Sequence, residues 1–106
     1  MQQKIISFDL GTGGNKASLY TLEGECLASA FEPYETRYPL VGWHEQSPED
    51  WWKAVVVSTR KLLSSTEVDP AEILALGISG HSQGPVAVDG NGNLLRADTT
   101  ICSAVR

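Results

Sequence analysis

Cysteine is scarce in this sequence, and it contains no long apolar run. Its two cysteines, Cys26 and Cys102, lie far apart, and the chain begins without the basic segment, apolar core and cleavage site of a signal peptide. We therefore expect two free, buried or half-buried thiols in a protein of the reducing cytoplasm. The longest apolar stretches, residues 54–57 and 73–76, fall far below the roughly 20 residues that cross a bilayer. No membrane partner is expected.

Positive charge is also scarce. Eight lysines and arginines stand against thirteen acidic residues, which gives a net charge of -5. Because the basic residues are scattered, no cationic face that could neutralise a row of phosphates is expected, and nucleic acid is a poor candidate partner. The length of 106 residues, 42% of them hydrophobic, fits one soluble globular unit with a single core.

Short strands are predicted in the first third of the chain, at residues 4–10, 16–21 and 25–31. The turns between them are short and contain glycine, which favours an antiparallel meander. Residues 32–46 hold two prolines and no sustained period, so we expect an irregular surface connection there.

A helix start is indicated by Ser47-Pro48-Glu49-Asp50. The serine would cap the helix, proline suits its first position, and the two acids would face the positive end of the helix dipole. The helix is expected to end near Ser64. All three tryptophans lie at its entry and are expected to pack rather than to stack on a sugar. Three- and four-residue spacing predicts that its core face consists of Trp52, Val55, Val56, Leu62 and Leu63.

The last third of the chain predicts a buried strand followed by a hairpin. Residues 73–78 are apolar without alternation, which favours a central strand with helices on both faces. Residues 86–88 and 94–95 flank a turn of Asp, Asn and Gly, which favours a hairpin. The result is a mixed α/β layer fold that is open at its end. Since the one predicted helix can cover only one face of such a strand, we expect exposed apolar surface and self-association.

The most informative segment is Asp9-Leu10-Gly11-Thr12 and the four residues that follow, where a strand delivers an acid into a turn of small residues. Consecutive N–H groups of such a turn can form a nest that binds anions, and glycine lets phosphate oxygens approach the backbone. Asp9 is placed to hold Mg²⁺ through water. A glycine-rich hairpin capped by its acid explains the pattern equally well. The predicted phosphate-binding residues are Gly11, Thr12, Gly13, Gly14, Asn15 and Lys16.

Four segments, in the same order, resemble motifs of the FGGY carbohydrate kinases. Asp9-Leu10-Gly11-Thr12 followed by Lys16 is similar to the family's first phosphate motif. Residues 42–52, 78–84 and 88–95 resemble, in turn, its segments Gly-Trp-x-Glu-Gln-x-Pro-x-x-Trp-Trp, Ile-Ser-Gly-Gln-Met-His-Gly and Leu-Asp-x-x-Gly-x-Leu-Leu. The resemblance implies an actin-like ATPase (ribonuclease H-like) fold. Residues 1–106 would form an incomplete N-terminal domain of it, with a mixed β-sheet and flanking helices.

The resemblance also implies a sugar pocket. In the family, the residues that line this pocket correspond to His81, Ser82 and Gln83, with Arg106 in a later segment. Glutamine and neutral histidine both offer a donor and an acceptor to sugar hydroxyls. A loop histidine bonded to backbone is the alternative for His81. When the later segment is aligned on Arg106, Cys102 and Ala104 replace a Trp and an Asp of the family, which leaves the substrate open.

The activity implied is transfer of the γ-phosphoryl group of ATP to a hydroxyl of a sugar, ketose or polyol, with Mg²⁺, in the cytoplasm. The family's base comes from a later segment, so no catalytic residue is assigned within residues 1–106. The adenine pocket is likewise expected elsewhere, and the isolated chain is expected to be inactive. A homo-oligomer is possible for the parent enzyme. The rival hypothesis is a non-catalytic sensor or scaffold on the same fold, which would hold nucleotide or sugar without turnover.

Overall fold

The computed structural model describes residues 2–80 and 85–101. Strands β1 (Lys4–Leu10), β2 (Gly14–Thr21) and β3 (Cys26–Pro33) form an antiparallel meander. The meander was predicted, although β2 begins two residues earlier than expected and β3 ends two residues later. The differences arise because Gly14 and Pro33 still pair across β2 and β3.

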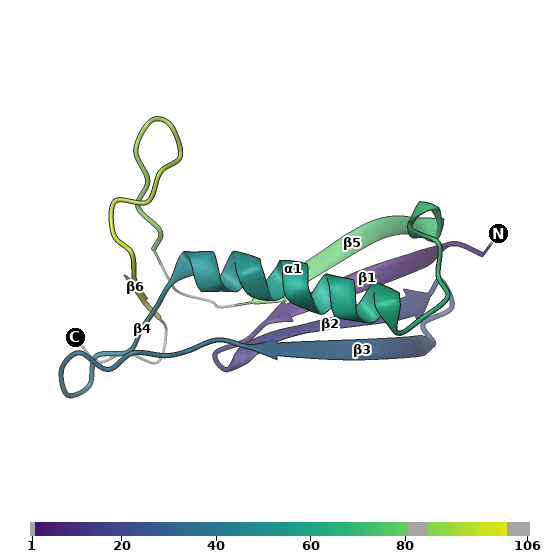
Figure 1. Cartoon of the computed structure of the whole chain (residues 1–106), viewed down its shortest axis with the longest axis horizontal. Helices are drawn as coiled ribbons and strands as arrows, with labels where there is room; N and C mark the ends of the chain where they lie inside the picture. The colour runs from purple at the N-terminus through teal and green to yellow at the C-terminus, as the bar shows by residue number, and fades with distance from the viewer. Residues whose placement is uncertain (1, 81–84, 102–106) are drawn as a thin grey trace.

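A fourth strand completes the sheet. The 3₁₀ turn η1 (Pro70–Glu72) leads into β5 (Ile73–Gly80), which pairs with β1 in parallel. The strand order is β3-β2-β1-β5, so the sheet is mixed, as predicted (Figure 1). The η1 turn is fixed by a capping box in which Asp69 accepts from Ala71 N–H and Glu72 accepts from Asp69 N–H.

Helix α1 (Pro48–Ser64) lies across β2 and β3 and covers one face of the sheet there. Alternation along the strands directs every second side chain toward this helix. The buried core cluster between helix and sheet consists of Ile6, Phe8, Ala17, Leu19 and Leu62. One layer of helix on one sheet is therefore what positions the β1–β2 turn.

Helix α1 has the predicted bounds but not the predicted core face. Its buried residues are Ala54, Ser58 and Leu62, at four-residue spacing, whereas Trp52 is 69% exposed. Small residues allow the helix to approach the sheet closely, so the stripe of contact passes through Ala54 and Ser58 rather than through Trp52. Ser47 is the N-cap residue, as predicted, but its side chain makes no capping hydrogen bond. The Ser47 carbonyl instead accepts from the N–H groups of the first turn.

Strand β5 differs from the expectation of a strand covered on both faces. It is the edge strand of the described sheet, and Leu74, Leu76 and Ile78 are 56%, 60% and 72% exposed. The reason is that α1 lies over β2 and β3 and does not reach β5. The expected exposed apolar surface is therefore present on this strand.

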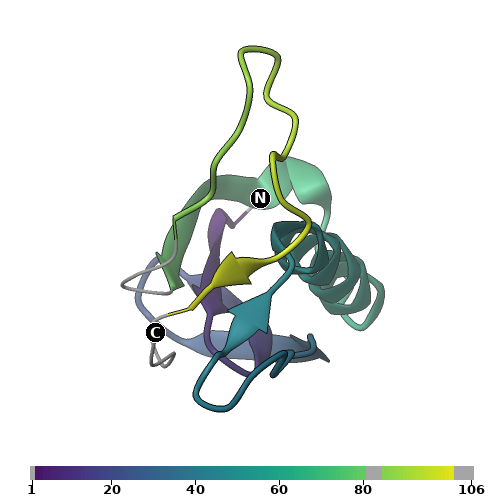
Figure 2. The same ribbon diagram turned by 90° about the vertical axis from the view of Figure 1, so that its left-hand side faces the viewer.

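A second, two-stranded sheet lies apart from the first. β4 (Glu45–Gln46) pairs antiparallel with β6 (Thr99–Thr100), side by side in Figure 2. The sequence did not predict this pair. Of the predicted hairpin, a single bridge, Val88 to Leu94, is formed, and its turn is held by Asp89 Oδ1, which accepts from two following N–H groups. This hairpin projects away from the sheet (Figures 1 and 2).

The molecule is elongated, with extents of 50 × 30 × 21 Å. Its radius of gyration is 15.8 Å, against about 13 Å for a compact domain of this length. Cys26 is free, as predicted, but exposed rather than buried, because it stands at the start of the edge strand β3. Cys102 lies outside the described residues. No helix in the described part of the chain is long and apolar enough to cross a membrane.

Candidate phosphate-binding site

The turn between β1 and β2 presents two free donors. It is closed by a hydrogen bond of 3.0 Å from the Gly11 N–H to the Gly14 carbonyl, and Thr12 and Gly13 are exposed at its tip. Within residues 2–80 and 85–101, the N–H groups of Thr12 and Gly13 have no acceptor. Adjacent N–H groups in such a turn are what an anion-binding nest requires.

The carbonyls of Gly11, Thr12 and Gly13 all accept hydrogen bonds from residues outside the turn. The Tyr34 hydroxyl donates to the Gly11 carbonyl, and the Tyr34 N–H donates to the Gly13 carbonyl over 3.3 Å. Gln46 Nε2 donates to the Thr12 carbonyl over 2.6 Å. Residues of the connection between β3 and α1 thus fix the orientation of the turn. Neither contact was predicted from the sequence, although Gln46 belongs to the motif at the helix entry.

The glycines of the turn have different reasons to be glycine. A Cβ at Gly14 would lie 2.5 Å from the Phe31 ring, 2.6 Å from the Glu32 carbonyl and 2.8 Å from Pro33 Cα, so β3 packs against this position. A Cβ at Gly13 would meet nothing within 4 Å. Gly13 is therefore the position that an outside ligand could approach, whereas Gly14 is explained by packing within the sheet.

Asp9 and Lys16 lie directly opposite each other on β1 and β2, and Ser79 of β5 is the other neighbour of Asp9. Directly paired residues share a face of a sheet, and Phe8 faces the core. Asp9 and Lys16 therefore lie on the face opposite to α1, and both are exposed. An accessible carboxylate beside the turn fits Mg²⁺, which keeps several waters and takes one or two carboxylates plus phosphate oxygens.

Asn15 is placed differently from the other predicted phosphate residues. Its side chain is fully buried, and Nδ2 donates to Ser58 Oγ of α1 over 2.8 Å. The side chain thus faces the helix and not the exposed tip of the turn. This part of the prediction is corrected to a contact between β2 and α1, which leaves only the Asn15 backbone near the turn.

Tyr34 keeps its proton over a wide pH range. Burial, and secondly the negative charge of Asp9, raise the pKa of Tyr34 from 10.0 to about 12. The hydroxyl is therefore protonated at neutral pH and can donate to the Gly11 carbonyl. The effect of Asp9 also indicates that its carboxylate and the Tyr34 ring are electrostatic neighbours at the same end of the sheet.

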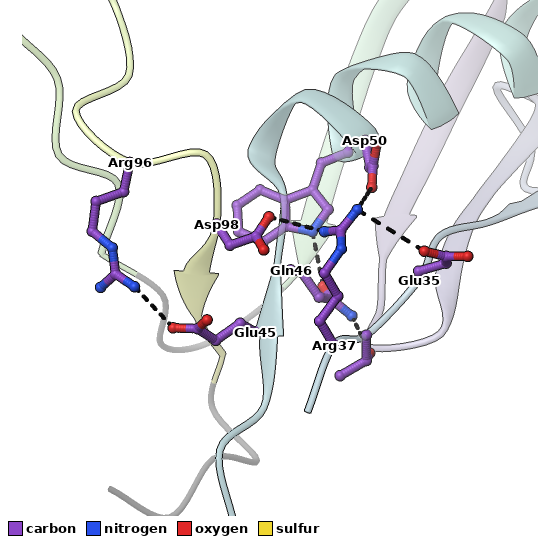
Figure 3. A network of polar contacts seen from close by, with 9 residues as sticks. Glu35, Arg37, Glu45, Gln46, Asp50, Arg96 and Asp98 are labelled. Carbon is purple, nitrogen blue, oxygen red and sulfur yellow. Dashed lines mark hydrogen bonds and ion pairs between the residues drawn. The ribbon is translucent and has the colours of Figure 1, made fainter. Parts of the chain in front are cut away.

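An ion-pair cluster joins the segment before α1 to the segment before β6 (Figure 3). The guanidinium of Arg37 lies at its centre, 2.9 Å from Asp98, 3.8 Å from Asp50 and 3.9 Å from Glu35. A second pair, Arg96 with Glu45 at 3.1 Å, lies beside β4. The pairs of Arg37 are partly exposed and contribute little singly, whereas the Glu45 carboxylate is buried. Together the pairs link the segments that carry β4 and β6. The cluster was not predicted from the sequence, because Asp98 lies 61 residues from Arg37 and Arg96 lies 51 residues from Glu45.

The predicted sugar-pocket residues lie outside the described residues. This applies to His81, Ser82, Gln83 and Arg106, and to the two positions of departure, Cys102 and Ala104. What the structure does place is the end of β5, where Gly80 packs against Leu10 of β1, so that a Cβ at Gly80 would lie 3.1 Å from Leu10 Cβ. Strand β5 therefore ends next to the start of the β1–β2 turn.

Comparison with known proteins decides the family. Residues 4–104 match the model of the FGGY family of carbohydrate kinases, N-terminal domain. This chain belongs to the FGGY family of carbohydrate kinases. Its fold is therefore the actin-like ATPase fold that the resemblance implied, of which the described elements form a part.

Curated relatives and solved structures agree with this assignment. A glycerol kinase of Citrifermentans bemidjiense is 30% identical over 79 residues, which cover 74% of this chain. A crystal structure of a xyloylose kinase from Brucella ovis is 28% identical, covers 98% of this chain and superposes with a TM-score of 0.89. A gluconate kinase from Lactobacillus acidophilus is 25% identical with a TM-score of 0.83. The FGGY chain described here spans 16% of the first and 21% of the second of these proteins.

Proposed function

We propose that this FGGY chain is the phosphate-binding part of an ATP-dependent carbohydrate kinase, which phosphorylates a hydroxyl of a sugar, ketose or polyol. The observation that carries the proposal is the β1–β2 turn, where Thr12 and Gly13 are exposed and their N–H groups have no acceptor among the described residues, next to the accessible Asp9. A family of kinases matches the chain from residue 4 to residue 104. Residues 1–106 would form an incomplete N-terminal domain, and the base and the adenine pocket would come from other segments.

Each residue of the site would have a role that follows from its chemistry. The N–H groups of the turn and the Thr12 hydroxyl would bind phosphate oxygens of ATP, and the Lys16 ammonium would offset phosphate charge. Asp9 would hold Mg²⁺ through water; the ion, when bound, would neutralise charge that develops on the transferred group. None of these groups forms a covalent bond to substrate, so the chain would act by positioning and electrostatics.

The acceptor side of the reaction is the less constrained part of the proposal. His81, Ser82, Gln83 and Arg106 stay the predicted sugar contacts, and the relatives act on different substrates by name, glycerol and gluconate among them. We therefore propose a substrate class and no single sugar. A cytoplasmic location remains part of the same proposal, as does the absence of nucleic-acid and membrane partners.

Self-association is proposed for the isolated chain through the bare strand β5, where Leu76 and Ile78 are 60% and 72% exposed. A lysine at position 76 would place a charge on that face and should favour the monomer. Analytical ultracentrifugation of the wild type and of Leu76→Lys measures this directly. A wild-type chain that stays monomeric at high concentration contradicts the proposal.

Asp9→Asn tests the proposed function. In the kinase that contains this chain, the substitution should lower kcat by roughly a hundredfold or more, the loss expected when one electrostatic group is removed. The fold should persist, because Asp9 is exposed. Glu23→Gln, in the exposed turn at the other end of β2, is the control and should leave kcat unchanged. Turnover by Asp9→Asn at the wild-type rate would remove Asp9 from the site, and no turnover by the wild type on any sugar or polyol would favour the non-catalytic rival.

A further inference from the structure

Gln46 connects the phosphate turn to the first turn of helix α1. Its side chain is fully buried. Nε2 donates to the Thr12 carbonyl over 2.6 Å and to Thr36 Oγ1 over 2.8 Å, and Oε1 accepts from Trp51 Nε1 over 2.8 Å. Figure 3 shows the Gln46 side chain among the residues that precede α1. A single amide therefore bridges the first turn of α1 and a turn that lies 34 residues before Gln46 in the chain.

The orientation of this amide is determined by its neighbours. An indole N–H can only donate, so the atom that faces Trp51 must be the amide oxygen. A backbone carbonyl can only accept, so the atom that faces Thr12 must be the amide nitrogen. Rotating the amide by half a turn would place two donors together and two acceptors together. Gln46 is thus held in one orientation by chemistry at both of its ends.

Holding a carbonyl also aims an N–H group. The peptide unit is planar and trans, so its C=O and N–H bonds point in opposite directions. The Thr12 carbonyl and the Gly13 N–H belong to one such unit, and Gln46 binds the carbonyl from the buried side. The Gly13 N–H must then point away from Gln46, toward the exposed side of the turn. Tyr34 acts on the preceding unit in the same manner, through the Gly11 carbonyl.

We propose that Gln46 is a positioning residue of the phosphate turn, which aims the Gly13 N–H at the phosphate and is itself oriented by Trp51. The proposal rests on the proposed function only for the identity of the ligand. The geometry of the turn is a property of the free chain. Trp51 and Trp52 are neighbours in sequence, but only Trp51 donates to Gln46, whereas Trp52 is 69% exposed. The pair therefore supplies a variant and its matched control.

The first experiment measures the order of the turn without any ligand. In the wild-type chain, the ¹⁵N order parameters of Thr12 and Gly13 should be near the value of about 0.85 for rigid backbone, and in Gln46→Ala they should fall below about 0.6. Trp51→Phe should lower them less, because Gln46 keeps its bonds to Thr12 and Thr36. Trp52→Phe should leave them unchanged. Equal order parameters in Gln46→Ala and the wild type would overturn the proposal.

Gln46→Glu provides a readout that loss of packing does not imitate. An ionised glutamate has no donor for the Thr12 carbonyl, but a protonated one can donate to Thr12 and still accept from Trp51. Acidification should therefore restore the order of the turn in Gln46→Glu and not in Gln46→Ala. Both variants keep the ionisable residues drawn around Gln46 in Figure 3, which are Glu35, Arg37, Glu45, Asp50, Arg96 and Asp98, so a pH effect common to the two is not rescue. Absence of rescue in a folded Gln46→Glu chain would contradict the proposal.

A wild-type measurement covers the case in which a variant fails to fold. The hydrogen bond from Gln46 Nε2 to the Thr12 carbonyl should give a scalar coupling across the bond and slow exchange of the Gln46 side-chain amide protons. Rapid exchange of those protons in the folded wild type would overturn the proposal. No substitution is needed for this result.

The second experiment adds inorganic tripolyphosphate with Mg²⁺ and follows the Thr12 and Gly13 amide signals. Gln46→Ala should weaken binding by about tenfold, the effect of roughly one hydrogen bond of positioning, and Trp52→Phe should not change it. A disordered turn that binds as tightly as the wild type would overturn the positioning role. A rigid wild-type turn that binds no tripolyphosphate would instead count against the proposed function and leave the orientation of the turn by Gln46 standing.

Discussion

Strands β2 and β5 flank β1 on its two sides, but their apolar side chains meet different surroundings. Leu19 and Leu76 both lie opposite Ile6 and therefore share a face of the sheet. Leu19 is 1% exposed beneath α1, whereas Leu76 is 60% exposed. The two strands are equally apolar at these positions. An apolar pattern therefore determines where a strand forms, while burial depends on which other element reaches it.

The largest change in stability is expected from truncating an apolar side chain beneath α1, and a much smaller one from truncating a side chain on β5. Leu62→Ala removes a fully buried side chain of α1 and should lower the free energy of unfolding by about 2–5 kcal/mol. Leu76→Ala, on the bare strand, should change it by less than about 0.5 kcal/mol when the chain is diluted enough to be monomeric. Urea unfolding followed by circular dichroism measures both. Similar losses from the two substitutions would mean that β5 is covered in solution, for example by a second copy of the chain.

A smaller change in stability is expected from adding a methyl group to either of the two strands that flank β1. Gly14→Ala on β2 would bring its Cβ within 2.6 Å of the Glu32 carbonyl, and the resulting overpacking should cost about 1–3 kcal/mol. Gly77→Ala on β5 meets nothing within 4 Å and should stabilise the strand by about 0.5 kcal/mol, since glycine is unfavourable inside a strand. Thermal unfolding of the two variants provides the measurement. A stable Gly14→Ala chain would show that β3 can move away from β2.

The elements that the sequence predicted well are those determined by nearby residues. The meander of β1, β2 and β3 follows from alternation and short turns, and α1 follows from Pro48 and the acids after it. The exposed tip of the β1–β2 turn, at Thr12 and Gly13, likewise depends on residues of the turn itself, and its role in binding phosphate stays a prediction. In each case the signal lies within a few residues of the structure that it determines.

The features that the sequence did not predict depend on residues far apart in the chain. Trp52 was assigned to the core by its spacing, but it lies on a side of α1 that is not covered by another element of the described chain, and it is 69% exposed. Asn15 was assigned to the turn by its position, and its contact with Ser58 depends on how α1 crosses β2. The bond from Gln46 to the Thr12 carbonyl crosses 34 residues. Single-sequence patterns carry no information on such pairings.

The smallest expected effect concerns Tyr34, which directly follows β3 and whose hydroxyl donates to the Gly11 carbonyl. Its pKa is raised from 10.0 to about 12, first by burial and then by the charge of Asp9. The unfolded chain therefore releases this proton at lower pH than the folded chain does. The corresponding stability is fully present below pH 10.0 and is lost as the pH rises to about 12.

Tyr34→Phe should remove this part of the alkaline loss of stability. Urea unfolding between pH 10.0 and about 12 should show a steeper fall for the wild type than for Tyr34→Phe. Tyr38→Phe, at a tyrosine that is 67% exposed, is the control and should keep the wild-type slope, because Tyr34 is still present. Asp9→Asn should lower the pKa of Tyr34, which the ultraviolet absorbance of the phenolate reports. Parallel curves for the wild type and Tyr34→Phe would mean that folding does not raise the pKa of Tyr34, which would contradict the burial of its hydroxyl.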